Sequence, residues 1–251
     1  MNKTEWIKLW KQEEEIAHVD GWDFSHIDGR CVEAPLPWDY RQTIDKYRTP
    51  TMHILDYDTG GGEFLLSLNH PYHNTAATEG YAPNVALCRQ TLPPLGIDFR
   101  PCNDPAHVPF PDGSFDLILN RHGDLHPGEL YRLLKKGGIL ITQQVGADND
   151  RDLVEMVLPH TPKPFPNATL KKQKQAFQAA GFQILEADEA FRPITFYDVG
   201  AFVWFARIIQ WEFPGFSVDQ CTDALLQMQR KIDTAGSIDG TIHRFLLVAQ
   251  K

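Results

Sequence analysis

From about residue 50 onwards the chain repeats one pattern: a short apolar run, a turn, and a segment with apolar residues at helical spacing. The run at 115–120 is almost wholly apolar, which is typical of a strand buried on both faces. We expect strands at 53–57, 75–79, 97–102, 115–120, 139–145, 182–187 and 241–249. Strands that alternate with helices predict a parallel sheet covered by helices on both faces.

Helices are predicted where apolar residues recur at helical spacing or where capping residues mark an end. They are expected at 4–19, 41–48, 63–68, 83–91, 129–134, 170–180, 198–211 and 218–234. Thr4 and Asp198 are the expected N-caps, and Gly181 is expected to close the helix before it. The pattern predicts an N-terminal helical and aromatic cap at residues 1–49. It also predicts an α/β domain at residues 50–251, with a two-helix insertion at about residues 196–236.

Composition narrows the functional classes. Hydrophobic residues make up 42% of the 251 residues, which is enough for a sizeable core. The formal net charge of −9 argues against a nucleic-acid partner, because phosphate recognition favours a basic surface. The four cysteines form no C-x-x-C pair, and the chain has no long apolar run. We therefore expect a soluble cytoplasmic protein with no disulfide framework, no metal and no membrane span.

A glycine-rich turn at residues 54–65, I-L-D-Y-D-T-G-G-G-E-F-L, joins an expected strand to an expected helix. Glycine lets the backbone approach a ligand closely, and a helix N-terminus offers free N–H groups to an anion. Glu79 ends the next strand, 23 residues after Asp56, where a carboxylate can accept hydrogen bonds from ribose hydroxyls. A dinucleotide-binding fold shares these features, but its G-x-G-x-x-G fingerprint fails at the last glycine when counted from Gly60.

These residues carry a resemblance to a known family. The turn resembles the methyltransferase signature D-x-G-x-G-x-G, with Asp56, Gly60 and Gly62 in register. The segment at 104–122 resembles the family's D-A-x-x-L-P-F-x-D-x-S-F-D, and R-L-L-K-K-G-G-I-L-I-T at 132–142 is similar to its R-V-L-K-P-G-G-x-L. The chain from about residue 50 to 250 thus resembles the class I S-adenosylmethionine-dependent methyltransferases, with a type 11-like methyltransferase domain.

The resemblance implies a Rossmann-like three-layer α/β/α sandwich whose seven-stranded sheet has the order 3-2-1-4-5-7-6, with strand seven antiparallel. It implies S-adenosylmethionine as cofactor, Glu79 at the ribose, Asp104 at the adenine amino group, and Asn120 and Arg121 beside the methionine end or the acceptor. The full set of implied cofactor contacts is Asp56, Asp58, Gly60, Gly62, Glu79, Gly80, Asp104, Pro105, Ala106, Asn120 and Arg121.

Asp58 departs from the family, which has glycine at this position. A carboxylate here is expected near the cofactor's own carboxylate, where two like charges ~4 Å apart repel by about 4 kcal/mol at an effective dielectric constant of about 20. Aspartate tolerates a positive φ better than most residues, so the turn can persist. Weakened cofactor binding, and a binding protein that has lost turnover, are the alternatives that Asp58 leaves open.

The segment R-H-G-D-L-H at 121–126 follows the strand expected at 115–120 and should open onto the transferred methyl group. His122 is the candidate general base for an acceptor O–H or N–H⁺, and a histidine bonded to loop backbone is the alternative. His122, Asp124 and His126 could instead hold a metal ion, although the sequence places no further ligand.

The acceptor pocket is expected under two aromatic segments. One carries Trp22, Phe24, Trp38 and Tyr40, and the other is residues 196–216. Most of these rings are expected to pack in the core, and a few to line an acceptor cavity. The sequence favours methyl transfer to a small molecule, with O-, N- and C-methylation all open. An RNA methyltransferase and a non-catalytic binding protein are the alternatives.

Overall fold

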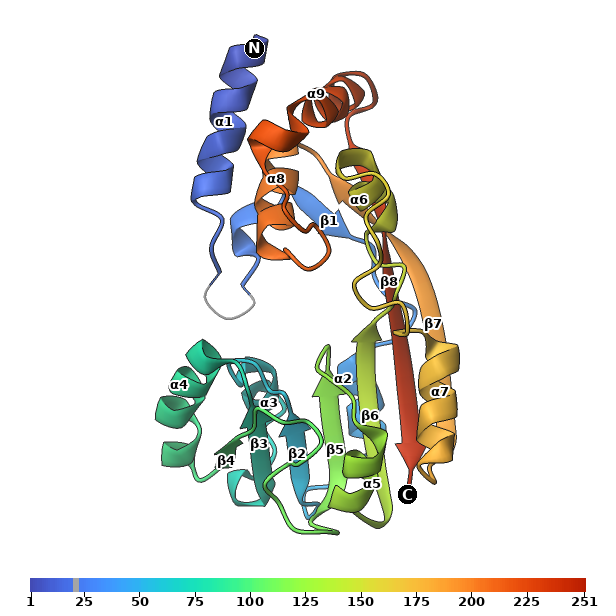
Figure 1. The fold of residues 1–251 in the computed structure, drawn as a ribbon. Coiled ribbons are helices and arrows are strands. Elements are labelled where there is room, and N and C mark those ends of the chain that lie inside the picture. The colour runs from blue at the N-terminus through green and yellow to red at the C-terminus, as the bar shows by residue number, and fades with distance from the viewer. Residues whose placement is uncertain (20–22) are drawn as a thin grey trace. The chain divides into compact units, whose positions relative to one another are not determined.

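The computed structural model describes residues 1–19 and 23–251, so Trp22 lies outside the described residues. The chain forms two compact units (Figure 1). Unit 1 consists of Met1–Leu36, Ala147–Pro166 and Ala190–His243, and unit 2 of Pro37–Gly146, Asn167–Glu189 and Arg244–Lys251. The segment expected as a cap, residues 1–49, is divided between the two units, whereas the expected two-helix insertion lies within unit 1.

The sheet of the described residues has eight strands in the order β1-β7-β8-β6-β5-β2-β3-β4. Their bounds are Cys31–Glu33 for β1, Ile54–Tyr57 for β2, Thr75–Glu79 for β3, Asp98–Pro101 for β4, Phe115–Arg121 for β5, Leu134–Val145 for β6, Gln183–Phe196 for β7 and Ile238–Gln250 for β8. Neighbouring strands from β4 to β6 are parallel, and β8 is antiparallel to β6. This confirms the expected mostly parallel sheet. Read from β4, the strands follow the expected order 3-2-1-4-5-7-6, with β1 added beyond the last of them.

The expected sheet was wrong in its number of strands and in the bounds of several of them. The described residues contain an eighth strand, β1, which pairs antiparallel with β7 through Cys31 and Phe196. β1 is three residues long and Val32 and Glu33 are exposed, so it has no apolar pattern that would reveal it. The strand expected at 139–145 begins earlier, because Leu134 pairs with Phe115 and the ladder shifts register before Leu117.

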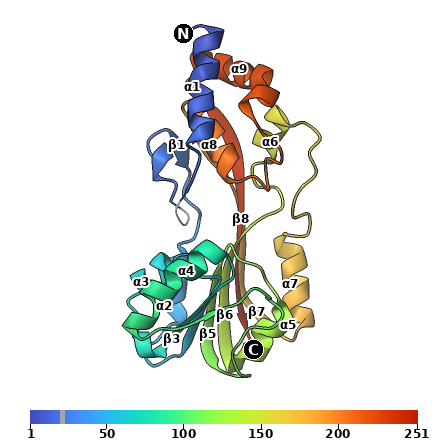
Figure 2. The same ribbon diagram turned by 60° about the vertical axis from the view of Figure 1, so that its left-hand side comes forward.

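Unit 2 has three layers because successive residues of each buried strand face opposite sides. Ile54, Leu117 and Ile141 pack in one apolar cluster, whereas Leu55 and Ile118 pack in another. The first cluster includes residues of α2 (Tyr40–Tyr47), α3 (Glu63–Ser67) and α4 (Ala82–Thr91), and the second includes residues of α5 (Pro127–Leu133) and α7 (Leu170–Ala179). Figure 2 shows the two groups of helices on either side of the strands, which confirms the three-layer α/β/α arrangement.

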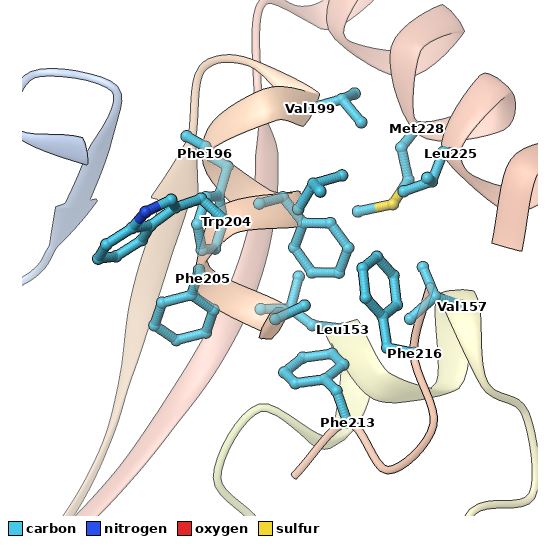
Figure 3. Packing of buried hydrophobic residues seen from close by; sticks show 14 of the residues in the cluster. Leu153, Val157, Phe196, Val199, Trp204, Phe205, Phe213, Phe216, Leu225 and Met228 are labelled. Atoms are coloured by element: carbon cyan, nitrogen blue, oxygen red, sulfur yellow. The ribbon is translucent and has the colours of Figure 1, made fainter. Parts of the chain in front are cut away.

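Unit 1 encloses an apolar core between α1 (Lys3–Glu15), α6 (Arg151–Val157), α8 (Val199–Ile208) and α9 (Val218–Ala235). Residues 199–206 of α8 are all buried. Phe196 and Phe205 meet edge to face, and Phe213 and Phe216 pack in the same cluster (Figure 3). Most rings of the 196–216 segment therefore pack in the core of unit 1.

Capping residues explain where the helices of unit 1 begin. The expected N-cap Thr4 was wrong, because Asn2 caps α1 and forms a reciprocal capping box with Glu5. Asp198 caps α8 as expected, since its side chain accepts the N–H of Ala201 at 2.8 Å. α6 was not expected from the sequence. Short 3-10 helices occur at Ser25–Ile27, Tyr72–Asn74 and Pro93–Leu95.

Candidate active site

The turn after β2 has the backbone conformation that its glycines allow. β2 is fully buried, and the chain then takes left-handed conformations at Asp58 (φ 58°), Gly60 (φ 66°) and Gly62 (φ 88°) before α3 begins at Glu63. Asp58 therefore adopts the conformation that the family's glycine would take, as aspartate tolerates it. The turn is preserved although the glycine is not.

The Glu79 carboxylate at the end of β3 is tied to this turn. Its Oε2 accepts the N–H of Gly60 at 2.8 Å, and its Oε1 accepts the N–H groups of Gly80 and Tyr81, each at 2.8 Å. Glu79 is only 7% exposed. A carboxylate offers roughly four acceptor positions, so about one remains, on Oε2. Glu79 thus holds the glycine turn in place and keeps room for a single further donor.

Gly80 and the turn after β4 lie beside Glu79. A Cβ on Gly80 would lie 2.6 Å from the carbonyl oxygen of Cys102, so this position requires glycine. The exposed Asp104 accepts the N–H of Ala106 at 2.9 Å and contacts His107 Nδ1 at 2.7 Å, while Pro105 is half-buried. The His107 contact is the main cause that lowers the pKa of Asp104.

Buried carboxyl groups gather at the carboxyl ends of β2 and β3. Asp56 accepts the Thr59 hydroxyl at 2.6 Å, and its burial raises its pKa to about 6. Burial, followed by the neighbouring carboxylates of Glu79 and Asp124, raises the pKa of Asp58 to about 7. Asp58 is therefore partly protonated near neutral pH.

Asn120, at the end of β5, lies in an internal hydrogen-bond network. Its amide donates to the Tyr57 carbonyl at 3.0 Å, and its Oδ1 accepts from Thr142 at 3.0 Å and from Gln144 at 2.5 Å. The Tyr40 hydroxyl donates to the Asn120 carbonyl at 3.0 Å. The Asn120 side chain is fully buried, so it braces the strand ends from within. The exposed Arg121 instead places its guanidinium 4.6 Å from the centre of the Phe64 ring.

His122 follows β5 in a left-handed conformation (φ 63°), and its N–H donates to the Gln143 carbonyl at 2.9 Å. Its Nε2 lies 3.3 Å from the Gln143 amide nitrogen, and Gln143 Oε1 accepts the indole N–H of Trp38 at 2.8 Å. Although the residue as a whole is exposed, desolvation of its ring, followed by the charges of Arg244 and Arg121, lowers the pKa of His122. The ring is therefore neutral at physiological pH.

Two sets of residues around the site were not assigned their place from the sequence. Gln143, Thr142 and Gln144 were missed, although three consecutive polar residues in an otherwise apolar strand are a usable signal. Tyr40 was expected in an aromatic cover, and it packs in unit 2 with its hydroxyl bonded to strand backbone. The predicted site residues all belong to unit 2, on or directly after β2, β3, β4 and β5.

Other kinds of site are less well supported. A cavity of about 220 Å³ in unit 2 is lined by His53, His73 and Asn74, before β2 and β3, and contains none of the predicted site residues. Among residues 1–19 and 23–251 no group of three or more histidine, cysteine, aspartate or glutamate side chains is placed to hold a metal ion. Within the same residues, no helix has both the length and the apolar character needed to cross a membrane.

Residues 55–142 match a family model described as a methyltransferase domain. No curated protein matches the sequence. Similar solved structures include a proposed methyltransferase from Bacillus halodurans C-125 at 16% identity, covering 85% of this chain and 98% of that one, with a TM-score of 0.57. YcgJ from Bacillus subtilis is 19% identical, with coverages of 84% and 97% and a TM-score of 0.55.

The cyclase SpnF also has this fold, at 17% identity, with 90% of each chain covered and a TM-score of 0.51. The fold therefore does not by itself fix the reaction. The matched segment identifies a methyltransferase domain, and the sheet order and the glycine turn are consistent with it. Residues 55–142 thus carry a methyltransferase domain, and the fold of the chain is consistent with the class I S-adenosylmethionine-dependent methyltransferases.

Proposed function

We propose that the protein transfers a methyl group from S-adenosylmethionine to a small-molecule acceptor. The observation that carries this proposal is the contact between Glu79 Oε2 and the Gly60 N–H at 2.8 Å. It joins a glycine turn, in left-handed conformations, to a carboxylate at the end of the neighbouring parallel strand. Ligands of open α/β sheets bind at this edge, outside the carboxyl ends of the strands.

The residues present fit the cofactor. The last acceptor position of Glu79 would take one ribose hydroxyl, and the absence of a side chain at Gly80 lets the turn after β4 pass close to the end of β3. Asp104, Pro105 and Ala106 would face the adenine, and Gly60 and Gly62 would let the backbone approach the methionine part. Asp56 and Asn120 would support this site from within, because both are buried and bonded internally. When bound, the cofactor supplies an activated methyl group, and the protein positions the acceptor.

The acceptor end of the site would lie beyond β5. Arg121 and His122 are exposed there, and the two residues offer a cation and a neutral imidazole to the acceptor. A net charge of −9 supports a small molecule over RNA, because phosphate-binding surfaces are basic. An RNA acceptor is the alternative substrate class.

A non-catalytic binding protein is the second candidate, and Asp58 is the observation that favours it. Its carboxylate would face the cofactor's own carboxylate. The pKa of about 7 lessens this objection, because Asp58 is neutral part of the time near neutral pH. Like-charge repulsion is then smaller than for a fully ionised pair.

Calorimetry with S-adenosylmethionine and S-adenosylhomocysteine, with NAD as control, tests the cofactor assignment. We expect both to bind, and ligand at 100 times its Kd to stabilise the protein by about 2.7 kcal/mol. Failure of both to bind, or tighter binding of NAD, contradicts the proposal. If S-adenosylmethionine binds but the protein forms no S-adenosylhomocysteine with any fraction of a small-molecule extract, the non-catalytic candidate is favoured.

A further inference from the structure

Three side chains at the end of β5 form a chain of hydrogen bonds that starts from an indole. Trp38 Nε1 donates to Gln143 Oε1 at 2.8 Å, and Gln143 Nε2 lies 3.3 Å from His122 Nε2. Trp38 and Gln143 are 105 residues apart in the sequence. The contact between them is therefore a product of the fold and not of local geometry.

The indole fixes the orientation of the Gln143 amide. A tryptophan N–H can only donate, so the amide atom that faces Trp38 must be the oxygen. The amide nitrogen then faces His122, and it too can only donate. His122 Nε2 must therefore be the acceptor, and a neutral imidazole with a bare Nε2 carries its proton on Nδ1.

The surroundings of His122 hold this arrangement in place. Its backbone N–H is bonded to the Gln143 carbonyl at 2.9 Å, and the next residue, Gly123, has no room for a Cβ because Asp58 Cβ would lie 2.6 Å away. Protonation of Nε2 would set its N–H against the amide NH₂. Arg121 on β5 and Arg244 on β8 act electrostatically on the ring, and the carboxyl groups of Asp58 and Asp124 lie next to Gly123 in the adjoining turns. The two guanidinium groups disfavour an imidazolium.

We propose that Gln143, oriented by Trp38, holds His122 as the neutral Nδ1–H tautomer, so that His122 donates a hydrogen bond to an oxygen atom of the methyl acceptor instead of removing its proton. Among the described residues, Nδ1 has no hydrogen-bond partner, so this donor is left for a ligand. A donor in this position, beside Arg121, fits an acceptor that presents a carboxylate, phenolate or carbonyl oxygen. Gln143 and Trp38 are then positioning residues.

The tautomer can be read directly from the nitrogen-15 spectrum of the histidine rings in the full-length protein. The chain has ten histidines, and His122→Asn assigns the ring of His122 by removing its signals. We expect the proton of His122 on Nδ1, and a ring that stays neutral down to about pH 5, below the ordinary histidine pKa of about 6.5. A proton on Nε2, or titration at the ordinary pKa, would overturn the proposal.

Two variants test whether Gln143 and Trp38 set the tautomer of His122. Gln143→Glu gives Nε2 an acceptor, so the proton should move to Nε2 and the pKa of His122 should rise above about 6.5. Trp38→Phe frees the amide to turn, and should shift the tautomer in the same direction. Gln175→Glu, an exposed change on α7, is the control and should leave the His122 signals unchanged. Unchanged His122 signals in both test variants would overturn the role of Gln143, provided that the other nine rings report a folded protein.

The inference rests on the proposed function only for the partner of Nδ1. If S-adenosylmethionine does not bind but His122 is the Nδ1–H tautomer, the proposed function fails and the hydrogen-bond chain stands. If the cofactor binds but the proton is on Nε2, the inference alone fails.

Discussion

The side chain of Asp58 accepts the backbone N–H of Asp124 at 3.2 Å. This contact joins the turn after β2 to the turn after β5, across 66 residues of sequence. The residue that departs from the glycine of the family therefore has a structural partner. Its partner lies in the loop that carries His122, so any change at position 58 acts on both turns.

Asp58→Asn should stabilise the protein at high pH. Burial raises the pKa of Asp58 to about 7, above about 3.9 in the unfolded chain, so the folded state binds this proton more tightly. The free energy of unfolding therefore falls as the pH rises from about 4 to about 7. Asparagine keeps the left-handed turn and an acceptor oxygen. Urea unfolding should show a gain of about 1–2 kcal/mol at pH 8 and none at pH 4. Asp188→Asn, at an exposed position, is the control, and an equal gain at both pH values would contradict the argument.

The same substitution should tighten the binding of S-adenosylhomocysteine, and do so more at pH 8.5 than at pH 6. At the higher pH the wild-type Asp58 is charged and repels the ligand carboxylate, whereas near pH 6 it is mostly neutral. Calorimetry at both pH values measures the difference. Weaker binding by Asp58→Asn would show that the carboxylate itself contacts the cofactor, and the case for a non-catalytic protein would lose its basis.

Glu79→Ala should cost both stability and cofactor affinity. The substitution leaves the N–H groups of Gly60, Gly80 and Tyr81 without their acceptor in a buried position, and each such group costs about 1–3 kcal/mol. Glu79→Gln keeps one acceptor oxygen and should lie between the two. Chemical unfolding and calorimetry on each variant separate the effects, with exposed Glu15→Ala as control. Full cofactor affinity in a folded Glu79→Gln would place the ribose elsewhere.

Gly80→Ala should destabilise unit 2, because its Cβ would lie 2.6 Å from the Cys102 carbonyl oxygen, a backbone atom that cannot turn aside. Overpacking of this kind costs about 1–3 kcal/mol. Gly128→Ala in α5 is the matched control, since nothing lies within 4 Å of its Cβ and alanine favours a helix. Thermal unfolding should rank Gly80→Ala below wild type and Gly128→Ala at or above it. The reverse order would mean that the backbone at Cys102 moves and makes room for the added Cβ.

Tyr40→Phe should destabilise the pairing of β5 and β6 around Asn120 and Ile141. The one hydrogen of the buried hydroxyl is shared between the Asn120 and Ile141 carbonyls, at 3.0 and 3.2 Å, and the hydroxyl oxygen accepts the Asn120 N–H at 3.2 Å. Removing it leaves buried backbone groups unpaired, at about 1–3 kcal/mol. Urea unfolding measures the loss, and Tyr72→Phe, at a residue 38% exposed, should have no comparable effect. Equal stability of both variants would show that water or backbone replaces the hydroxyl.

Local patterns predicted the strands from β2 to β5 well, whereas they missed β1 and misplaced the start of β6 and the end of β7. The bounds of β3, Thr75–Glu79, were predicted at both ends because the strand is wholly buried between clear turns. β7 runs to Phe196, well beyond the expected residue 187, through charged residues and Pro193. Proline and charge normally argue against a strand, and here pairing with β1 overrides them.

The candidate site also combines features that one stretch of sequence predicts with features that only the fold creates. The glycine turn and Glu79 are local signals that one stretch of sequence contains. The surroundings of His122 depend on Trp38 and Gln143, which only the fold brings together. Asn120 illustrates the difference, because its place at a strand end is a local prediction, whereas its bonds to Tyr57, Thr142 and Gln144 arise only in the fold.

Unit 1 has a consequence for synthesis. Its core is assembled from three separate stretches of chain, Met1–Leu36, Ala147–Pro166 and Ala190–His243. Helix α1 contributes the fully buried Trp10, yet α8 and α9, which it contacts, are translated about 200 residues after it. At about 5–20 residues per second, the apolar face of α1 waits on the order of ten seconds or more for its partners. During that interval the nascent chain exposes the apolar face of α1, a surface that a chaperone would recognise. The duration of this exposure is set by the rate of translation and not by the rate of hydrophobic collapse.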